Sequence, residues 1–125
     1  MIDIIRDDIQ KEFVKGFKER GIAYHTKRAE HAPLPYVKLW ELNTWSDLHK
    51  THEEMYVRFT FWVWDEAYNT KGNLDLLKEI HQLAINMDVE GLVMVERDKE
   101  SFRDAQKPDT KCTVVVYTYK IIRGY

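Results

Sequence analysis

The chain has 125 residues and a mass of 15.0 kDa, which is the size of one domain, so we expect a single domain over residues 1–125. Hydrophobic residues make up 44% and charged residues 32%, proportions that exclude global disorder. The 19 basic and 21 acidic side chains give a net charge of −2, which argues against a protein that grips nucleic acid through its phosphates. One cysteine, Cys112, excludes an internal disulfide and a thiolate zinc site.

Neither a secretory leader nor a membrane span is predicted. The first eight residues lack a basic segment followed by an apolar run, and no stretch approaches the roughly 20 apolar residues that cross a bilayer. We therefore expect a soluble cytosolic protein without membrane contact. The chain does hold four Trp, seven Tyr and five Phe, more than a small core requires, so some of these rings should face a partner.

The first predicted element is an amphipathic helix over residues 2–20. Its apolar side chains fall within an arc of about 120°, as a helix lying on a sheet requires. These side chains are Ile2, Ile5, Ile9, Phe13 and Phe17. Gly21 stands where a C-cap belongs. The polar segment after it, residues 22–35, ends in two prolines, Pro33 and Pro35, which favour an extended entry into a strand over about residues 36–42.

Residues 55–64 alternate strictly and give the clearest predicted strand. One face would carry Met55, Val57, Phe59, Phe61 and Val63, and the other Tyr56, Arg58, Thr60, Trp62 and Trp64. At about 3.3 Å per residue this strand would be about 33 Å long, more than a small core needs, so one end should project as a long hairpin. The polar connection before it, which contains Trp45, is predicted as a loop.

A second helix is predicted over residues 74–87, with Thr70, Gly72 and Asn73 as turn or cap residues. Its apolar face spans about 200°, which is too wide for one sheet contact. This face should therefore also meet the first helix or another subunit. His81 lies within it, which indicates a packing or interface histidine.

The C-terminal third reads as a turn at Gly91, a short apolar run over residues 92–95, a charged stretch over residues 96–109 and a last strand over residues 113–122. The predicted order of elements is α-β-β-α-β-β. This order predicts an α+β fold, in which two helices pack on one face of a mainly antiparallel sheet.

The residue types that could carry catalysis or bind a metal do not form a recognisable active-site motif in this sequence. The densest polar group is His49 and His52, followed by two glutamates, but its His-x-x-His spacing lacks the helical i, i+4 geometry of a zinc protease, and we favour a solvated loop. No histidine adjoins Cys112 in sequence, so an inert thiol at the start of a strand is expected. The five glycines are dispersed and form no phosphate-binding loop. We therefore expect no enzyme, no cofactor and no metal site.

The candidate functional site is a surface. Tyr56, Arg58, Trp62 and Trp64 share the face of the 55–64 strand that points away from the predicted core, and aromatic and arginine side chains are enriched in protein interfaces. Two helices on the other face leave nothing of the chain to cover this one. We therefore predict a subunit or partner interface, to which Trp45 and Phe102 are added from the adjoining polar segments.

The order of these features resembles that of the tail-terminator, or tail-completion, proteins of long-tailed bacteriophages and prophages, which take part in head-to-tail joining. The resemblance covers about residues 2–122. Its more specific parts are the strand entry Pro33-Leu34-Pro35-Tyr36-Val37 and the strand end Phe61-Trp62-Val63-Trp64-Asp65. The chain departs from the family after the Pro108-Asp109 turn, where Thr110 stands in place of a frequent glycine.

The resemblance implies an α+β subunit without catalytic function that assembles as a hexameric ring, caps the tail tube and meets the head connector. Its implied partners are further copies of itself, the tail tube protein and the head connector protein. DNA would only pass through the lumen, which suits the slightly acidic net charge. Such a protein would assemble in the cytoplasm of the bacterial host and reside in the tail or neck of the virion. The 43–53 and 97–110 loops would reach the tail tube or the connector.

Three alternatives stay open. The first is a neck adaptor or stopper protein of the head-tail connector. The second, from another class, is a small metal-dependent hydrolase that uses His49, His52 and a nearby glutamate. The third is a cytosolic α+β dimer that binds a small ligand against the aromatic face of the sheet.

Overall fold

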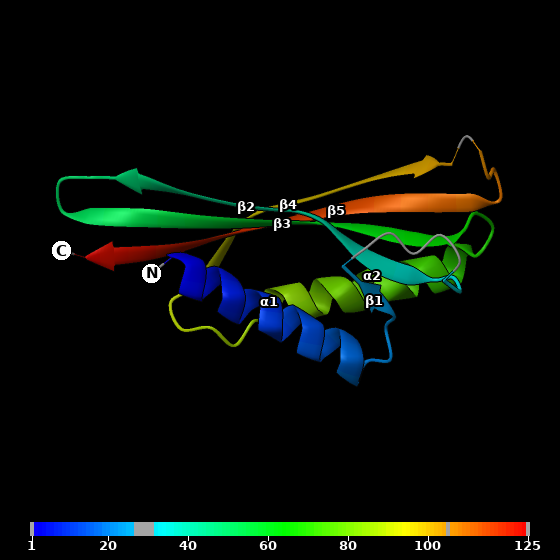
Figure 1. Cartoon of the computed structure of the whole chain (residues 1–125), viewed down its shortest axis with the longest axis horizontal. Helices are drawn as coiled ribbons and strands as arrows, with labels where there is room; N and C mark the ends of the chain where they lie inside the picture. Colours follow the sequence, from blue (N-terminus) through cyan, green and yellow to red (C-terminus); the bar gives the residue numbers. More distant parts are fainter. Residues whose placement is uncertain (1, 27–31, 105, 125) are drawn as a thin grey trace.

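The computed structural model of the chain describes residues 2–26, 32–104 and 106–124. Its elements are α1 (Ile2–Glu19), β1 (Tyr24–His25), β2 (Tyr36–Leu48), β3 (His52–Glu66), α2 (Thr70–Ile85), β4 (Val93–Arg103) and β5 (Thr110–Gly124). The strands form one five-stranded sheet in the order β1-β2-β3-β5-β4. Both helices lie on the same side of this sheet, as Figure 1 shows. The predicted α+β class is confirmed.

The sheet is mixed, and it contains one strand more than the predicted order α-β-β-α-β-β. The additional strand, β1, lies in the segment predicted as a polar connection and pairs in parallel with β2, where Tyr24 is opposite Val37. The pairs β2–β3, β3–β5 and β4–β5 are antiparallel. A strand of two residues is too short to show alternation, so it leaves no periodic signal in the sequence.

The four long strands extend beyond their predicted bounds. The largest corrections concern β2, which continues to Leu48, and β4, which takes up residues 93–103 of the predicted apolar run and charged stretch. Trp45 therefore lies in a strand, and much of the expected 43–53 and 97–110 loops is strand as well. β4 is exposed along almost its whole length, so its pairing with β5, rather than burial of its side chains, holds it in the sheet.

The first helix ends close to where the sequence predicts. Gly21 has a φ of +67°, and its N–H donates to the Lys18 carbonyl at 3.2 Å. The N–H of Ile22 donates to the Phe17 carbonyl at 2.8 Å. These two bonds form a Schellman motif, which requires the left-handed conformation that glycine adopts at little cost. Neither of the described helices has the length and apolar character needed to cross a membrane.

The second helix begins earlier than predicted, at Thr70, so Gly72 and Asn73 lie inside it rather than before it. Asn73 is buried, and its Nδ2 donates to Oδ2 of the buried Asp65 at the end of β3. This bond links the end of β3 to the first turn of α2. The wide apolar face is only partly covered, because Leu83 packs against α1 at Gly16 while Leu74 is 55% exposed.

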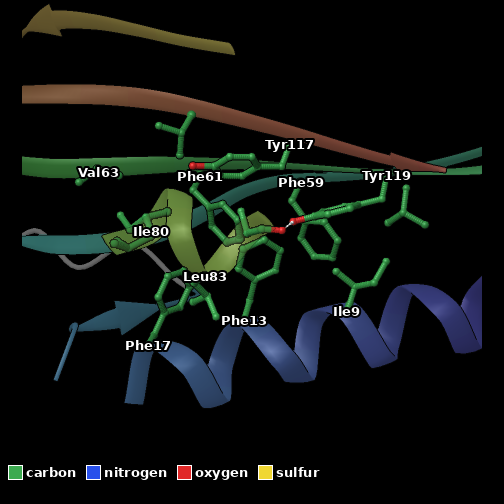
Figure 2. Packing of buried hydrophobic residues seen from close by; sticks show 14 of the residues in the cluster. Ile9, Phe13, Phe17, Phe59, Phe61, Val63, Ile80, Leu83, Tyr117 and Tyr119 are labelled. Atoms are coloured by element: carbon green, nitrogen blue, oxygen red, sulfur yellow. Dashed lines mark hydrogen bonds between the residues drawn. The ribbon is translucent and has the colours of Figure 1, made fainter. Parts of the chain in front are cut away.

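The core lies between the helices and the inner face of the sheet, with aromatic rings at its centre (Figure 2). Phe13 of α1 is 1% exposed, and its ring centroid lies 4.8 Å from that of Phe61 and 5.1 Å from that of Phe59. It also contacts the rings of Tyr117 and Tyr119 on β5. The inner-face residues of the 55–64 segment are those that the alternation predicts.

The two hairpins point to opposite ends of the sheet. The turn between β2 and β3 lies beside the end of β5, because His52 pairs with Gly124. The connection between β4 and β5 lies at the other end, where Thr110 pairs with Glu66. In Figure 1 the β2–β3 hairpin extends past the N-terminal end of α1, and residues 46–51 are exposed. The two connections are therefore separated by the length of the long strands.

Candidate functional site

The face of the sheet opposite the helices, called the outer face below, carries the six predicted interface residues. Residues directly opposite each other on neighbouring strands point to the same side of a sheet. Trp45 is opposite Tyr56. Trp64 is opposite Cys112, which is in turn opposite Phe102. The complete predicted set on this face is Trp45, Tyr56, Arg58, Trp62, Trp64 and Phe102.

Four rings form a cluster at the β1 end of this face, called the tryptophan cluster below: Trp40, Trp62, Trp64 and Phe102. Trp40 and Trp62 stack with ring centroids 4.0 Å apart and planes 14° apart. The Phe102 ring meets both Trp62, at 6.0 Å, and Trp64, at 6.4 Å, edge to face. Trp40 is 48% exposed and Phe102 43% exposed, so the cluster presents a partly open aromatic surface.

Trp40 is the member that sequence reasoning missed. The register between β2 and β3 shifts between Leu39 and Glu41, which leaves Trp40 as the extra residue of a β-bulge. In β2, the even-numbered residues before the bulge, such as Lys38, face the same side as Trp62. After the bulge, the odd-numbered residues, such as Trp45, face that side. Strict alternation would place Trp40 and Trp45 on opposite faces, and the bulge brings both to the outer face. No sequence signal marks its position.

A hollow of about 550 Å³ lies beside the tryptophan cluster. Its walls include Leu34, which precedes β2, and Asp104, Gln106 and Lys107, which follow β4. Polar side chains and one leucine therefore surround the tryptophan cluster on this side. An apolar centre inside a polar rim is the usual arrangement of a protein interface.

A second group on the outer face is centred on Trp45, Tyr56 and Arg58, which contact one another and the neighbouring strands. Trp45 stacks on Tyr56 with ring centroids 5.1 Å apart, and the Arg58 guanidinium lies 5.0 Å from the Trp45 ring. Arg58 also forms an ion pair with Glu96 of β4 at 3.2 Å, and its Nε donates to Oγ1 of Thr118 at 3.1 Å. Through these contacts Arg58 of β3 connects Trp45 of β2, Thr118 of β5 and Glu96 of β4 on this face.

The tip of the β2–β3 hairpin brings together His49, His52 and Glu54. The two imidazole rings stack with centroids 4.4 Å apart. The Glu54 carboxylate approaches both rings, with Oε2 3.6 Å from His49 Nε2 and Oε1 3.4 Å from His52 Nε2. The Tyr56 hydroxyl donates to Glu54 at 2.8 Å, which is the main reason that the pKa of Glu54 lies below its ordinary value. The sequence indicates a solvated polar segment but not this convergence.

Two other residues considered from the sequence take part in packing, Cys112 in the interior and His81 at a partly exposed position. Cys112 is fully buried, and burial raises the pKa of its thiol to about 12, which agrees with an inert thiol. His81 stacks on Tyr117 and contacts the guanidinium of Arg97. Partial burial, and then the charge of Arg97, hold the pKa of His81 below its usual value. Its contacts are those of a packing histidine.

Comparison with known proteins identifies a solved structure with a similar fold, but it does not assign this chain to a family. No protein-family model matches this chain, and no curated protein sequence matches it. Among solved structures, the chain is similar to one from the virion of a native gene transfer agent particle, with a TM-score of 0.63 and 15% sequence identity. The match covers 95% of this chain and 94% of that one. The shared fold therefore takes in nearly the whole of both chains.

Proposed function

We propose that this chain is a structural virion protein that assembles as a hexameric ring, caps the tail tube of a phage-like particle and joins it to the head connector. The observation that carries the proposal is the tryptophan cluster on the outer face. The solved structure of the same fold belongs to the virion of a gene transfer agent particle, which supports a virion location for this chain as well. In this role the protein has no catalytic function.

The cluster has the chemistry of a subunit interface. Aromatic side chains carry much of the binding energy at the centre of interfaces, and a stable contact buries about 800 Å² on each partner. A closed ring needs two different surfaces that meet head to tail. The outer face supplies one of them. The opposite, helical side exposes apolar residues that supply the other, among them Leu74 at 55% and Ile4 at 61% exposure.

The two hairpin connections suit contacts along the axis of such a ring. They lie at opposite ends of the long strands, and residues 49–51 at one end and 106–109 at the other are exposed. In this proposal one connection meets the tail tube and the other meets the head connector. The proposal thus narrows the contact regions from the predicted 43–53 and 97–110 segments to the parts that lie outside the strands.

Light scattering across a range of protein concentrations tests the ring. We expect a discrete species at the mass of six 15.0 kDa chains. The double variant Trp62→Ala, Trp64→Ala should dissociate it, because it removes the centre of the tryptophan cluster. Leu48→Ala is the matched control, since Leu48 is 73% exposed but lies outside the cluster. A ring that survives the double variant, or a stable dimer at every concentration, would contradict the proposed interface.

A binding experiment with purified tails and heads distinguishes a tail terminator from a neck adaptor or stopper. Purified tails that lack the protein and purified heads filled with DNA are each incubated with it, and the bound fraction is measured after sedimentation. A tail terminator should bind the tails first. Prior binding to heads would support the adaptor or stopper instead.

A further inference from the structure

The tip of the β2–β3 hairpin holds a set of ligand atoms that takes no part in the proposed contact between subunits. Within the described residues, His49, His52 and Glu54 each offer one ligand atom, and these atoms all lie within 4.8 Å of one another. Two imidazole nitrogens and one carboxylate are a common ligand set for Zn²⁺, with water at the fourth position. The three side chains come from one turn and one strand, so the hairpin itself sets their arrangement.

The contacts of the two histidines with the Glu54 carboxylate are longer than direct hydrogen bonds and go to different oxygens, Oε2 for His49 and Oε1 for His52. A charge-assisted hydrogen bond between nitrogen and oxygen is about 2.7–2.9 Å long. The His49 and His52 contacts with Glu54 are longer, at 3.6 and 3.4 Å. Ligands about 2.0–2.1 Å from a tetrahedral zinc ion lie about 3.3–3.4 Å from each other. The two imidazole rings are stacked, so they must rotate for both Nε2 atoms and one Glu54 oxygen to reach these separations around one ion.

Outer-shell contacts already orient two of the three ligands. The Tyr56 hydroxyl donates to Glu54 Oε2 at 2.8 Å, and the Tyr56 ring is itself stacked on Trp45. Thr51 Oγ1 lies 3.1 Å from Nδ1 of His52. If Nδ1 donates to this hydroxyl, Nε2 is left with the lone pair that a metal requires. Such contacts to the second nitrogen or oxygen of a ligand are the usual support of protein metal sites.

A backbone hydrogen bond also holds the turn that carries these residues. The His49 N–H donates to the His52 carbonyl at 2.8 Å, which fixes the turn that places the two rings side by side. Asp47 is opposite Glu54 in the β2–β3 pairing and adds a second negative charge on the same face. A dication at the tip would thus meet two carboxylates on this face, to which Lys120, opposite Tyr56, adds one positive charge.

We propose that His49, His52 and Glu54 form a site for one Zn²⁺ ion at the tip of the β2–β3 hairpin, with water as the fourth ligand. This differs from the sequence-based expectation that the chain has no metal site. The ion ties the turn, through His49, to β3, through His52 and Glu54, and so stiffens the end of the hairpin that extends past α1. The site is independent of the tryptophan cluster, which lies toward the other end of the outer face.

Calorimetric titration of the chelator-treated protein with Zn²⁺ tests the proposal. We expect one ion per chain with an affinity in the micromolar range or tighter, and a rise in Tm on binding. Co²⁺ in place of Zn²⁺ should give the visible absorption of a tetrahedral site. His49→Ala and His52→Ala should each abolish saturable binding, and Tyr56→Phe should weaken it about 10-fold, as loss of an outer-shell contact does.

Two controls separate this site from general binding to surface histidines. Lys50→Ala changes the same turn without removing a ligand, and His81→Ala removes a histidine far from the tip. Both should bind one ion as tightly as the wild type. Circular dichroism verifies that each variant is folded. Absence of saturable binding below millimolar Zn²⁺, or equal binding by the His49→Ala variant, would overturn the site. The same titration of the Trp62→Ala, Trp64→Ala variant should be unchanged, so failure of the ring leaves this test intact.

Discussion

Two tyrosines on the inner face of β5, Tyr117 and Tyr119, differ in the hydrogen bond of the side-chain hydroxyl. Tyr117 and Tyr119 are each 2% exposed and both contact the ring of Phe13. The hydroxyl of Tyr119 donates to the carbonyl of Ala84 near the end of α2 at 2.7 Å. Within the described residues no such bond is found for Tyr117. Tyr119 therefore fastens the end of α2 to the sheet, while Tyr117 contributes packing alone.

The variant Tyr119→Phe should lower the free energy of unfolding by about 1–3 kcal/mol, because it leaves the Ala84 carbonyl without its donor in the protein interior. Tyr117→Phe, which removes the same atom from the same strand, should change it by less. Urea denaturation followed by circular dichroism measures both. Equal losses in the two variants would show that the hydroxyl of Tyr119 has no special part in stability.

At the scale of residues, the sequence predicts side-chain direction wherever alternation is unbroken. The inner and outer faces of β3 follow from the strict pattern of residues 55–64. Trp40 could not be assigned in this way, because the bulge beside it reverses the parity of β2. The convergence of His49 and His52 with Glu54 depends on the position of the turn, which polar residues leave undefined.

At the scale of elements, the close approach of α1 and α2 depends on Gly16. A Cβ atom built at Gly16 would lie 2.2 Å from Cδ1 and 2.6 Å from Cδ2 of Leu83, which is 7% exposed. Leu83 thus occupies the space that a side chain on α1 would fill. The absence of a side chain at this position permits the contact between the two helices.

Gly16→Ala should therefore destabilise the protein, although alanine is favoured over glycine in a helix by about 1 kcal/mol. Overpacking a filled core costs about 1–3 kcal/mol and outweighs this gain. The loss should shrink or reverse when Leu83→Ala is present, since the space is then open. A double-mutant cycle measured by urea denaturation gives the coupling. Additive effects of the two changes would contradict the contact.

The elements that could be predicted are those whose burial imposes a period. The first helix shows an apolar stripe because one side of it covers the sheet, and β3 alternates because one face is core. In contrast, β4 is held by its pairing with β5 and carries charged residues on an exposed edge. Its composition therefore resembles that of a loop. The short β1 depends on its contact with β2 and has no pattern of its own.

At the scale of the whole molecule, the distribution of aromatic residues is asymmetric. Phenylalanine and tyrosine fill much of the core between helices and sheet. All four tryptophans of the chain, by contrast, lie on the outer face. Intrinsic tryptophan fluorescence therefore reports on this face alone. This property connects the proposed ring with a measurement that needs no label.

When the protein assembles, we expect the tryptophan emission to shift to shorter wavelength and acrylamide quenching to fall, because an interface on the outer face removes water from the rings. Trp40, at 48% exposure, should contribute most to the change. The variant Trp45→Phe keeps the tryptophan cluster complete and should show the same response. Assembly with unchanged emission and quenching would mean that the subunits meet through another surface, since a contact that covers the outer face cannot leave its tryptophans in the same environment.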